Sequence, residues 1–450
     1  MLQRIALMAI AAPRRVLVAA LLVMVGCGIF GVPVAQQLSA GGFQDPTSES
    51  AEATQLLVDK FGQGDMELLI SVTSEGADGI EGAAARAVGT DIAAQLEKSP
   101  YVANVTSAWT APPAATPALI SRDGGTGLIV AGITGGESDA QKYAKELTDE
   151  LVYDRDGVTV KAGGVVMVNV QINSQNEKDL LMMEAIAIPL SFVVLVWVFG
   201  GLLAAALPLA VGAFAILGSM AVLRGITMVT DVSIFALNLS IALGLALAID
   251  YTLLIVSRYR DELADGADRE RALVRTMVTA GRTVLFSAMT VALSMVAMVL
   301  FPMYFLKSFA YAGIAVVGFA AVAAIVVAPA AIALAGDRLD SLDVRRLIRR
   351  ILGRPEPQPK PIEQMFWYRS TKFVMRRSIP IGLVVVVLLL LLGAPFLGAK
   401  WGFPDDRVLP TSASSRQIGD ALRTDFEVDS STNVTVVLPN TDGITPDALD

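Results

Sequence analysis

One ionisable side chain, the carboxylic acid of Asp250, interrupts the apolar run from Ile241 to Ser257. An Asp at the centre of a membrane-spanning helix costs about 2.5 to 3.5 kcal/mol. Such an acid normally faces a bundle interior or a wet cavity and serves a function. We therefore expect Asp250 to bind and release a proton that is taken up from outside. A proton that crosses 100 mV yields about 2.3 kcal/mol, which would bias the bundle between two packings.

The residues around Asp250 in this segment include a hydroxyl group and several small side chains. Tyr251 places a hydroxyl one residue further round the helix. Ala242 and Ala246 share the stripe of Asp250, and their small size lets another helix approach closely. Ser287, in the next apolar segment, is a weaker candidate that could bond across helices or back to its own helix. Asp250 is therefore the predicted proton-binding residue, with the Tyr251 hydroxyl as its neighbour.

The competing interpretation is an acid near the cytoplasmic boundary that only pairs with Arg258 or Arg260. Eight residues of helix put Arg258 roughly 12 Å from Asp250, which is too far for easy pairing. Two other acids, Glu184 and Asp231, fall near the expected ends of spans, where water solvates them. We therefore favour a functional role for Asp250 alone among these acids.

Composition excludes several classes of chemistry. The 450 residues include no histidine and one cysteine, and 54% are hydrophobic, with a net charge of −8. Zinc sites, disulfide frameworks and histidine-based catalysis are therefore excluded. No Gly-x-x-x-x-Gly-Lys-Ser/Thr loop occurs, which argues against an ATP-driven pump. We expect no enzyme, no metal and no cofactor, and the proton motive force as the only energy source.

The elements that must position these residues are seven apolar segments, each long enough for a hydrocarbon core of roughly 30 Å. They lie at 16–35, 180–199, 202–223, 232–257, 283–301, 308–335 and 380–399. The first is too long for a signal peptide's apolar region and predicts an uncleaved anchor, the alternative being cleavage after Ala40. The second to sixth form one bundle, 180–335.

Basic residues orient the spans. With the segment 1–15 in the cytoplasm, the inside segments hold 20 of the 35 Lys and Arg residues. The short loops on the other side hold only Arg224 and Lys307. This asymmetry follows the positive-inside rule and predicts a multi-pass protein of the inner membrane with a cytoplasmic N-terminus. The acidic segment 36–179 then lies outside, and the basic linker 336–379 inside, resting on anionic headgroups.

The outside segment 36–179 alternates helix and strand signals. A helix is expected at Thr47–Phe61, with Thr47 or Ser48 as its N-cap. Strands follow at 66–72, 102–109, 118–121, 128–134 and 158–162, and helices at 78–97 and 138–151. Counting the two short strands around the Asp123-Gly124-Gly125 turn as a hairpin arm and its partner gives βαββαβ, the split βαβ unit of an α+β domain.

An internal repeat about 360 residues long links the two ends of the chain. Arg14-Arg15, an apolar span, Gly42-Phe43, Pro46-Thr47-Ser48 and Phe61 recur as Arg376-Arg377, a span, Gly402-Phe403, Pro410-Thr411-Ser412 and Phe426. A strand-like stretch follows each series, at 66–72 and 433–438. The segment 400–450 therefore starts a second outside domain, and we expect the rest of the second repeat in the same full-length chain or in a partner chain.

The residues Ala248–Leu263, which contain Asp250 and Tyr251, resemble the MmpL (mycobacterial membrane protein large) transporters of the resistance–nodulation–division (RND) superfamily. The segments Gly281–Ala288 and Phe301–Lys307 match as well. So does the arrangement of one span, an outside domain and five spans. The resemblance implies an RND-type α-helical polytopic membrane protein with a porter-like outside domain.

The resemblance also implies a proton-driven exporter of lipids or siderophores to the actinobacterial cell envelope. Asp250 and Tyr251 are then half of the relay, and Ser287 matches a family serine near it. Leu254 stands where some members have phenylalanine. The expected partners are membrane lipids, a lipid substrate and the second transmembrane half, with a homo-oligomer left open and no nucleic acid. The alternatives are a lipid- or sterol-sensing protein like Patched, or a SecDF-like auxiliary that exports no substrate itself.

Overall fold

The computed structural model of the chain describes residues 1–39, 41–74, 76, 78–340, 350, 361, 365–399, 402, 404–426 and 436–438. These residues form two compact units. One comprises Met1–Ser341 with Asp405–Asp450, and the other is Leu342–Pro404. The first unit contains a helical bundle and an α+β domain, and the second contains one further apolar helix.

Seven helices of the described chain are long and apolar enough to cross a membrane. These helices confirm the predicted polytopic helical fold class. They are α2 with its 3-10 extension (Pro13–Gln36), α6 (Gly164–Phe199), α7 (Leu202–Thr227), α8 (Phe235–Ala264), α9 with its 3-10 extension (Arg269–Leu300), α10 with α11 (Tyr304–Ala335), and α14 with its 3-10 extension (Ser378–Gly398).

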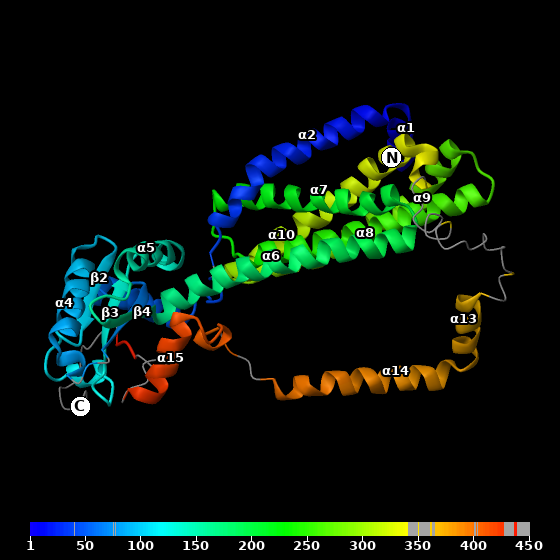
Figure 1. The fold of residues 1–450 in the computed structure, drawn as a ribbon. Coiled ribbons are helices and arrows are strands. Elements are labelled where there is room, and N and C mark those ends of the chain that lie inside the picture. Colours follow the sequence, from blue (N-terminus) through cyan, green and yellow to red (C-terminus); the bar gives the residue numbers. More distant parts are fainter. Residues whose placement is uncertain are drawn as a thin grey trace. The chain divides into compact units, whose positions relative to one another are not determined.

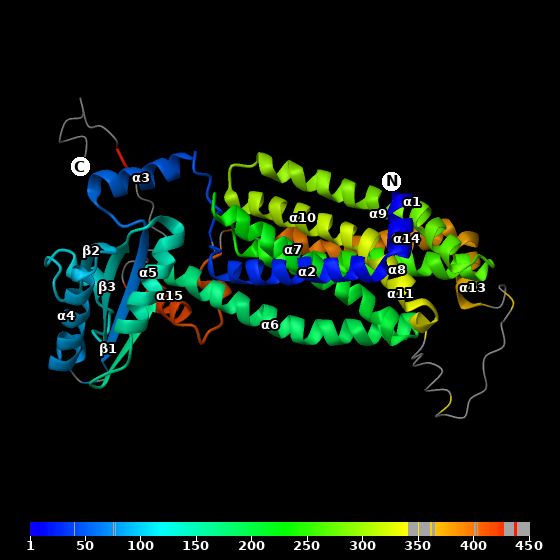
Figure 2. The same ribbon diagram turned by 90° about the horizontal axis from the view of Figure 1, so that it is seen from above.

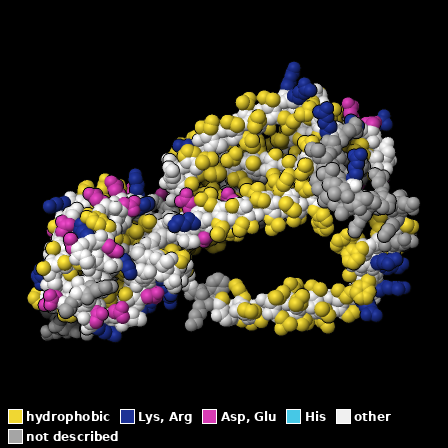
Figure 3. Space-filling view, in the orientation of Figure 1, with side chains coloured by type: hydrophobic (Ala, Val, Ile, Leu, Met, Phe, Trp, Pro, Cys, Tyr) yellow, Lys and Arg dark blue, Asp and Glu magenta, His cyan; other side chains and the backbone are white. Residues whose placement is uncertain are grey.

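Helices α7, α8 and α10 form the centre of the bundle, with α2 alongside α7 and α9 against α8 and α10 (Figures 1 and 2). Small residues let these helices approach closely. A side chain at Gly244 of α8 would meet Ile216 of α7 at 2.8 Å and Val316 of α10 at 2.9 Å. The visible face of the bundle is largely hydrophobic, whereas charged side chains gather on the α+β domain (Figure 3).

The α+β domain has the predicted split βαβ topology. Its elements are β1 (Met66–Ser74), α4 (Ala83–Lys98), β2 (Val102–Ser107), β3 (Thr126–Ile133), α5 (Gly136–Leu151) and β4 (Val158–Gly163). The sheet order is β2-β3-β1-β4, and every neighbouring pair is antiparallel. Hydrophobic side chains such as Leu68 and Ile70 of β1 alternate toward the face that packs with Ile92 and Leu96 of α4.

One predicted strand is wrong. Instead of a strand at 118–121, the chain forms a 3-10 turn at Thr116–Leu119 and a single bridge between Ile120 and Gly127. Pro117 explains the absence of a strand here, because it fixes its own φ and has no N–H to donate to a β-ladder. The hairpin partner of β3 is therefore β2, reached through this longer connection.

A helix from the start of the second repeat, α15 (Ser414–Asp425), covers the other face of the same sheet. Its Ile418 and Leu422 pack with Leu69 of β1 and Leu128 of β3. Gln171 of α6 binds the N-terminal turn of α15, where its amide donates to Ser414 Oγ at 2.7 Å. The counterpart of α15 in the first repeat, α3 (Glu49–Phe61), is capped by Ser48 and has no buried residue.

The second unit contains α13 (Phe366–Arg376) and α14 (Ser378–Gly393). α14 has no charged side chain and no buried residue, as suits a helix in lipid. Of the arginines in the predicted basic linker, Arg345, Arg346 and Arg349 lie outside the described residues. Of the stretch 433–438, only Val436–Leu438 is described, and these residues form no strand.

Candidate functional site

Asp250 and Tyr251 lie in the middle of α8, where the helix passes between its neighbours. Asp250 is exposed, whereas Tyr251 is only 5% exposed and belongs to the core of the bundle. Consecutive residues of an α-helix point about 100° apart, so the two groups face different surroundings. The two predicted relay residues are thus adjacent in the chain but meet separate environments.

The exposed face of α8 is lined by small residues on both preceding turns. Ala242 and Ala246 share the stripe of Asp250 and are exposed as well. The opposite stripe, with Gly244 and Ala248, is buried against α7 and α10. No helix of the described chain therefore covers the Asp250 stripe. Because an ionised carboxylate is costly in lipid, this face requires a protein partner or a wet cavity.

The structure brings Tyr251 and Ser287 together. Ser287 of α9 is half-buried and lies against the Tyr251 hydroxyl at the α8–α9 contact. Among the described residues, however, the Tyr251 hydroxyl has no partner within hydrogen-bond geometry. The hydroxyls of Thr252 and Ser240, also on α8, are buried and unpaired too. Buried polar groups without partners usually have a functional or solvent contact, so this part of α8 is a candidate path for a proton.

The basic residues beyond Asp250 have other partners. Arg258 pairs with the buried carboxylate of Glu262, one turn further on, and Arg275 of α9 lies 3.3 Å from the same carboxylate. Arg260 lies over the ring of Phe199, 5.7 Å from its centroid. Within the described chain, no ion pair joins Asp250 to either arginine of α8. The geometry therefore does not support the competing interpretation of Asp250 as a structural ion-pair partner.

The two weaker acids lie elsewhere in the bundle. Glu184 is half-buried in α6. Asp231 is exposed just before α8 and accepts a long hydrogen bond of 3.4 Å from Ser138 Oγ. Neither acid lies on the Asp250 stripe of α8. Asp250 therefore stands alone on this stripe among the acids of the predicted spans.

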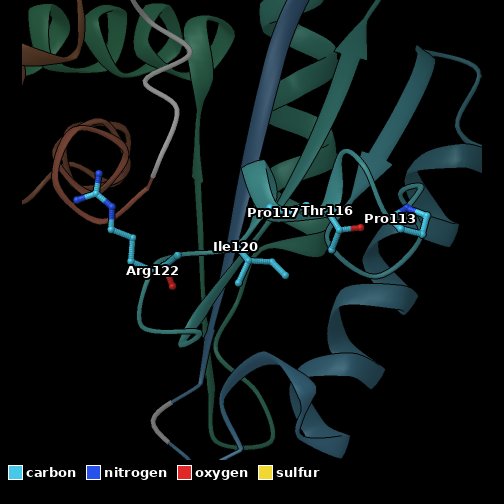
Figure 4. Close-up of a pocket in the computed structure, with 6 residues that line it drawn as sticks. Pro113, Thr116, Pro117, Ile120 and Arg122 are labelled. Carbon is cyan, nitrogen blue, oxygen red and sulfur yellow. The ribbon is translucent and has the colours of Figure 1, made fainter.

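The α+β domain carries a shallow groove of about 570 Å³ beside α15 (Figure 4). Its lining residues are Pro113, Thr116, Pro117, Ile120, Ser121 and Arg122. The backbone N–H of Arg122 donates to the carbonyl of Asp425 at 2.8 Å, and its guanidinium reaches the carbonyl of Thr424. The charge at this groove therefore helps to hold the C-terminal end of α15. Within the described part of the chain, no group of acids and cysteine has the arrangement of a metal site.

The fold assembles two polar clusters that were not predicted from the sequence. The first is the ion-pair cluster around Glu262. The second joins Glu137 of α5 to Tyr304 at the start of α10, 167 residues apart in the sequence, by a hydrogen bond of 3.0 Å. Residues so far apart in the sequence leave no periodic signal. A local sign of this cluster is the Gly41-Gly42 pair, because Gly41 lies against Glu137 and Gly42 lies against Tyr304.

Comparisons with known proteins agree with this architecture. The family model described as "MMPL family" matches residues 42–381. The trehalose monomycolate exporter MmpL3 of Mycobacterium tuberculosis is 37% identical over 58% of this chain and 30% of that protein. The exporter of the same name from Mycolicibacterium smegmatis is 29% identical over 93% of this chain and 44% of that protein. The chain thus spans less than half the length of these curated relatives.

Among solved structures, a heavy metal efflux pump aligns with a TM-score of 0.42 and 17% sequence identity, over 60% of this chain and 36% of that chain. The family match covers the α+β domain, the bundle with Asp250, and the start of the seventh candidate span. The chain belongs to the MMPL family of the RND superfamily.

Proposed function

We propose that this chain forms the first repeat of a proton-motive-force-driven exporter, which carries lipids or lipid-like molecules across the cytoplasmic membrane to the cell envelope. The observation that carries the proposal is the exposed Asp250 on a stripe of small residues in an apolar helix. Two relatives are named exporters of trehalose monomycolate, which supports a lipid-like cargo.

The proposed energy-coupling step is a change in the charge of Asp250. When the carboxylate is ionised, the α8 face needs water or a polar partner, because burial of an unpaired charge is costly. When it is protonated, the same face tolerates close apolar packing against another helix. Each proton that moves inward through a potential of 100 mV supplies about 2.3 kcal/mol to drive this exchange of packings. No cofactor takes part in the proposed step.

Tyr251 and Ser287 have a different proposed role, because they lie inside the bundle. Their hydroxyls lie at the α8–α9 contact, one residue round the helix from the carboxylate. A hydroxyl both donates and accepts, so this pair suits transfer of a proton between Asp250 and the buried polar groups of α8. The partner of the Asp250 face is proposed to be a helix of the second repeat.

The proposed orientation places the N-terminus in the cytoplasm and the α+β domain outside, in the inner membrane. Its support is the distribution of basic residues, of which the short loops at the domain side hold only Arg224 and Lys307. Lipid substrate would then reach the α+β domain from the outer leaflet or through the bundle. In this proposal, the second transmembrane half comes from the same full-length chain or from a partner chain. Self-association of the transporter is a separate part of the proposal.

The experiment compares Asp250→Asn with Glu184→Gln, a matched acid-to-amide change in α6. Each variant is expressed with its second-repeat polypeptide in cells depleted of their own exporter, and lipid delivery to the envelope is measured. We expect Asp250→Asn to abolish export at normal membrane levels and Glu184→Gln to retain it. Undiminished export by Asp250→Asn would remove the proton-relay role. Proton uptake without lipid delivery would favour the SecDF-like or lipid-sensing alternative.

A further inference from the structure

The first turn of α5 meets the domain-side end of the bundle at a compact polar cluster. Glu137 Oε2 accepts hydrogen bonds from the backbone N–H of Gly42 and from the hydroxyl of Tyr304, each at 3.0 Å. The Tyr304 hydroxyl also lies 3.2 Å from Ser39 Oγ. Three segments therefore converge on one carboxylate: α5, the start of α10, and the connection that follows α2.

Two glycines make this convergence close. A Cβ on Gly41 would lie 1.8 Å from the carboxyl group of Glu137. A Cβ on Gly42 would lie 2.5 Å from the ring of Tyr304, and the positive φ of Gly42, +95°, disfavours any other residue. A side chain at either position is therefore excluded by lack of space. At Gly42 it is also disfavoured by the backbone conformation.

The same cluster reaches the start of α8, the helix that carries Asp250. The backbone N–H of Ser39 donates to the carbonyl of Val232, and the N–H of Ile234 donates to the carbonyl of Ser39. The N–H of Ser233 donates to Ser308 Oγ of α10 at 2.9 Å. The segments before α8 and at the start of α10 are therefore linked through hydrogen bonds to the residues that contact Glu137.

Aromatic rings next to the polar cluster join the same elements. Phe43 lies 4.7 Å from Phe305 of α10 and 5.8 Å from Phe235 of α8, measured between ring centroids. Phe235 and Phe305 also contact each other edge to face at 5.7 Å. Packed rings of this kind resist small displacements. The starts of α8 and α10 are therefore packed against the connection that leads to the α+β domain.

The α+β domain also has two covalent connections to the bundle, the segment that follows α2 and the junction of β4 with α6. β4 ends at Gly163, and α6 begins at Gly164 and continues for 36 residues into the bundle. At 1.5 Å per residue, this helix is about 54 Å long. A domain held by these two covalent connections alone can pivot about α6, whereas a domain held also at Glu137 must follow the relative positions of α6, α8 and α10.

We propose that Glu137 and Tyr304 form a latch, through which repacking of α8 and α10 reorients the α+β domain. This inference rests on the proposed function for its role in transport, but the latch itself is a structural property of this chain. Glu137 and Tyr304 are positioning residues in this account, since they act on the domain and not on the proton or the cargo.

The test measures the distance between the α+β domain and the helical bundle by double electron–electron resonance in lipid nanodiscs. In a Cys27→Ser background, spin labels are attached at Glu97→Cys, exposed on α4, and at Val229→Cys, exposed between α7 and α8. We expect one narrow distance distribution, which Tyr304→Phe and Glu137→Ala broaden and shift. Asp139→Asn, on the same turn of α5, and Glu137→Gln, which keeps the acceptor oxygen, are expected to match the unmodified chain. An unchanged distribution in both Tyr304→Phe and Glu137→Ala would overturn the latch.

A second arm separates the latch from the proposed function. Asp250→Asn, which mimics the protonated acid, is added to the labelled chain with and without Tyr304→Phe. We expect Asp250→Asn to shift the distance when the latch is intact and to lose that shift when Tyr304 is replaced. A shift that persists undiminished with Tyr304→Phe overturns the latch. No shift with the latch intact counts against Asp250 as the driver, while the first arm still decides whether the latch exists.

Discussion

Asp250 and Tyr251 are consecutive residues of α8 with opposite surroundings: the carboxylate is exposed, and the phenol is 5% exposed. The carboxylate therefore contacts whatever packs against the exposed face of α8. The phenol is held by the bundle of this repeat, beside Ser287 of α9. The roles of Asp250 and Tyr251 can therefore be tested separately.

The first prediction concerns the Tyr251 hydroxyl, which is buried without a hydrogen-bond partner among the described residues. Because an unpaired buried hydroxyl costs about 1 to 3 kcal/mol, Tyr251→Phe should leave the thermal stability unchanged or raise it. If the hydroxyl carries the proton, the same variant should lose export. The measurement pairs thermal unfolding in detergent with the export assay, and Ser287→Ala serves as the neighbouring comparison. Wild-type export by Tyr251→Phe would exclude this hydroxyl from the relay.

The second prediction concerns the ion-pair cluster of Glu262, whose side chain is 6% exposed, whereas those of Arg258 and Arg275 are 41% and 63% exposed. Removing both arginines strands a buried charge, so Arg258→Met with Arg275→Met should destabilise the fold by about 3 kcal/mol. Glu262→Gln leaves two arginines that water can solvate and should cost less. Thermal unfolding of both variants checks the order, and the reverse order would contradict this account of the cluster.

The third prediction concerns a close approach of three helices in the bundle, at Gly244 of α8. Gly244→Ala places a methyl group within 3 Å of side chains on both α7 and α10, and overpacking of this kind costs about 1 to 3 kcal/mol. Gly225→Ala is the matched control, since nothing lies within 4 Å of its added Cβ. We expect a lower melting temperature for Gly244→Ala and an equal or higher one for Gly225→Ala. Equal stability of the two variants would show that α8 is not tightly packed there.

The fourth prediction is a pH dependence of the α+β domain. Burial raises the pKa of Glu67 on β1 above its usual value. The folded domain therefore binds this proton more tightly than the unfolded chain does, and it loses stability as the pH rises from about 4.3 through the raised pKa. Glu67→Gln cannot ionise, so at pH 7 it should protect β1 and β3 more strongly than the unmodified chain.

Hydrogen exchange of peptides from β1 and β3, corrected for the intrinsic effect of pH, measures this difference. The advantage of Glu67→Gln should vanish at a pH below about 4, where Glu67 is protonated in both states. Glu97→Gln, an exposed position on α4, should show no such advantage. An advantage of Glu67→Gln that is equally large at low pH would contradict the assigned cause.

The local elements of this fold are readable from the sequence because they depend on local patterns. Alternating residues such as Leu68 and Ile70 predict β1, and uncharged runs of about 20 residues predict the spans. The prediction of a strand at 118–121 is wrong because Pro117 has no N–H to donate to a ladder, and pairing across the turn is limited to the single Ile120–Gly127 bridge. Asp250 stands out in the sequence because one charge in an apolar run has a large energetic cost, and its role in proton transfer stays a prediction.

The remaining features depend on contacts between distant residues. The Glu137–Tyr304 hydrogen bond and the packing of α15 on β4 join segments separated by more than 160 residues. Neither charge nor periodicity near Glu137 distinguishes it from the other acids of the segment 36–179. The family resemblance predicts only that Ser287 lies near the relay. The contact between Tyr251 and Ser287 depends on the packing of α8 against α9.

The central claim is that Asp250 changes its protonation state within the membrane. Infrared difference spectroscopy of the protein in lipid follows the protonated-carboxyl signal as the pH of the medium is changed. We predict a titrating signal in the unmodified protein that is missing from Asp250→Asn and retained in Glu184→Gln. The same signal in Asp250→Asn, or an Asp250 that stays ionised at every pH, would contradict the account.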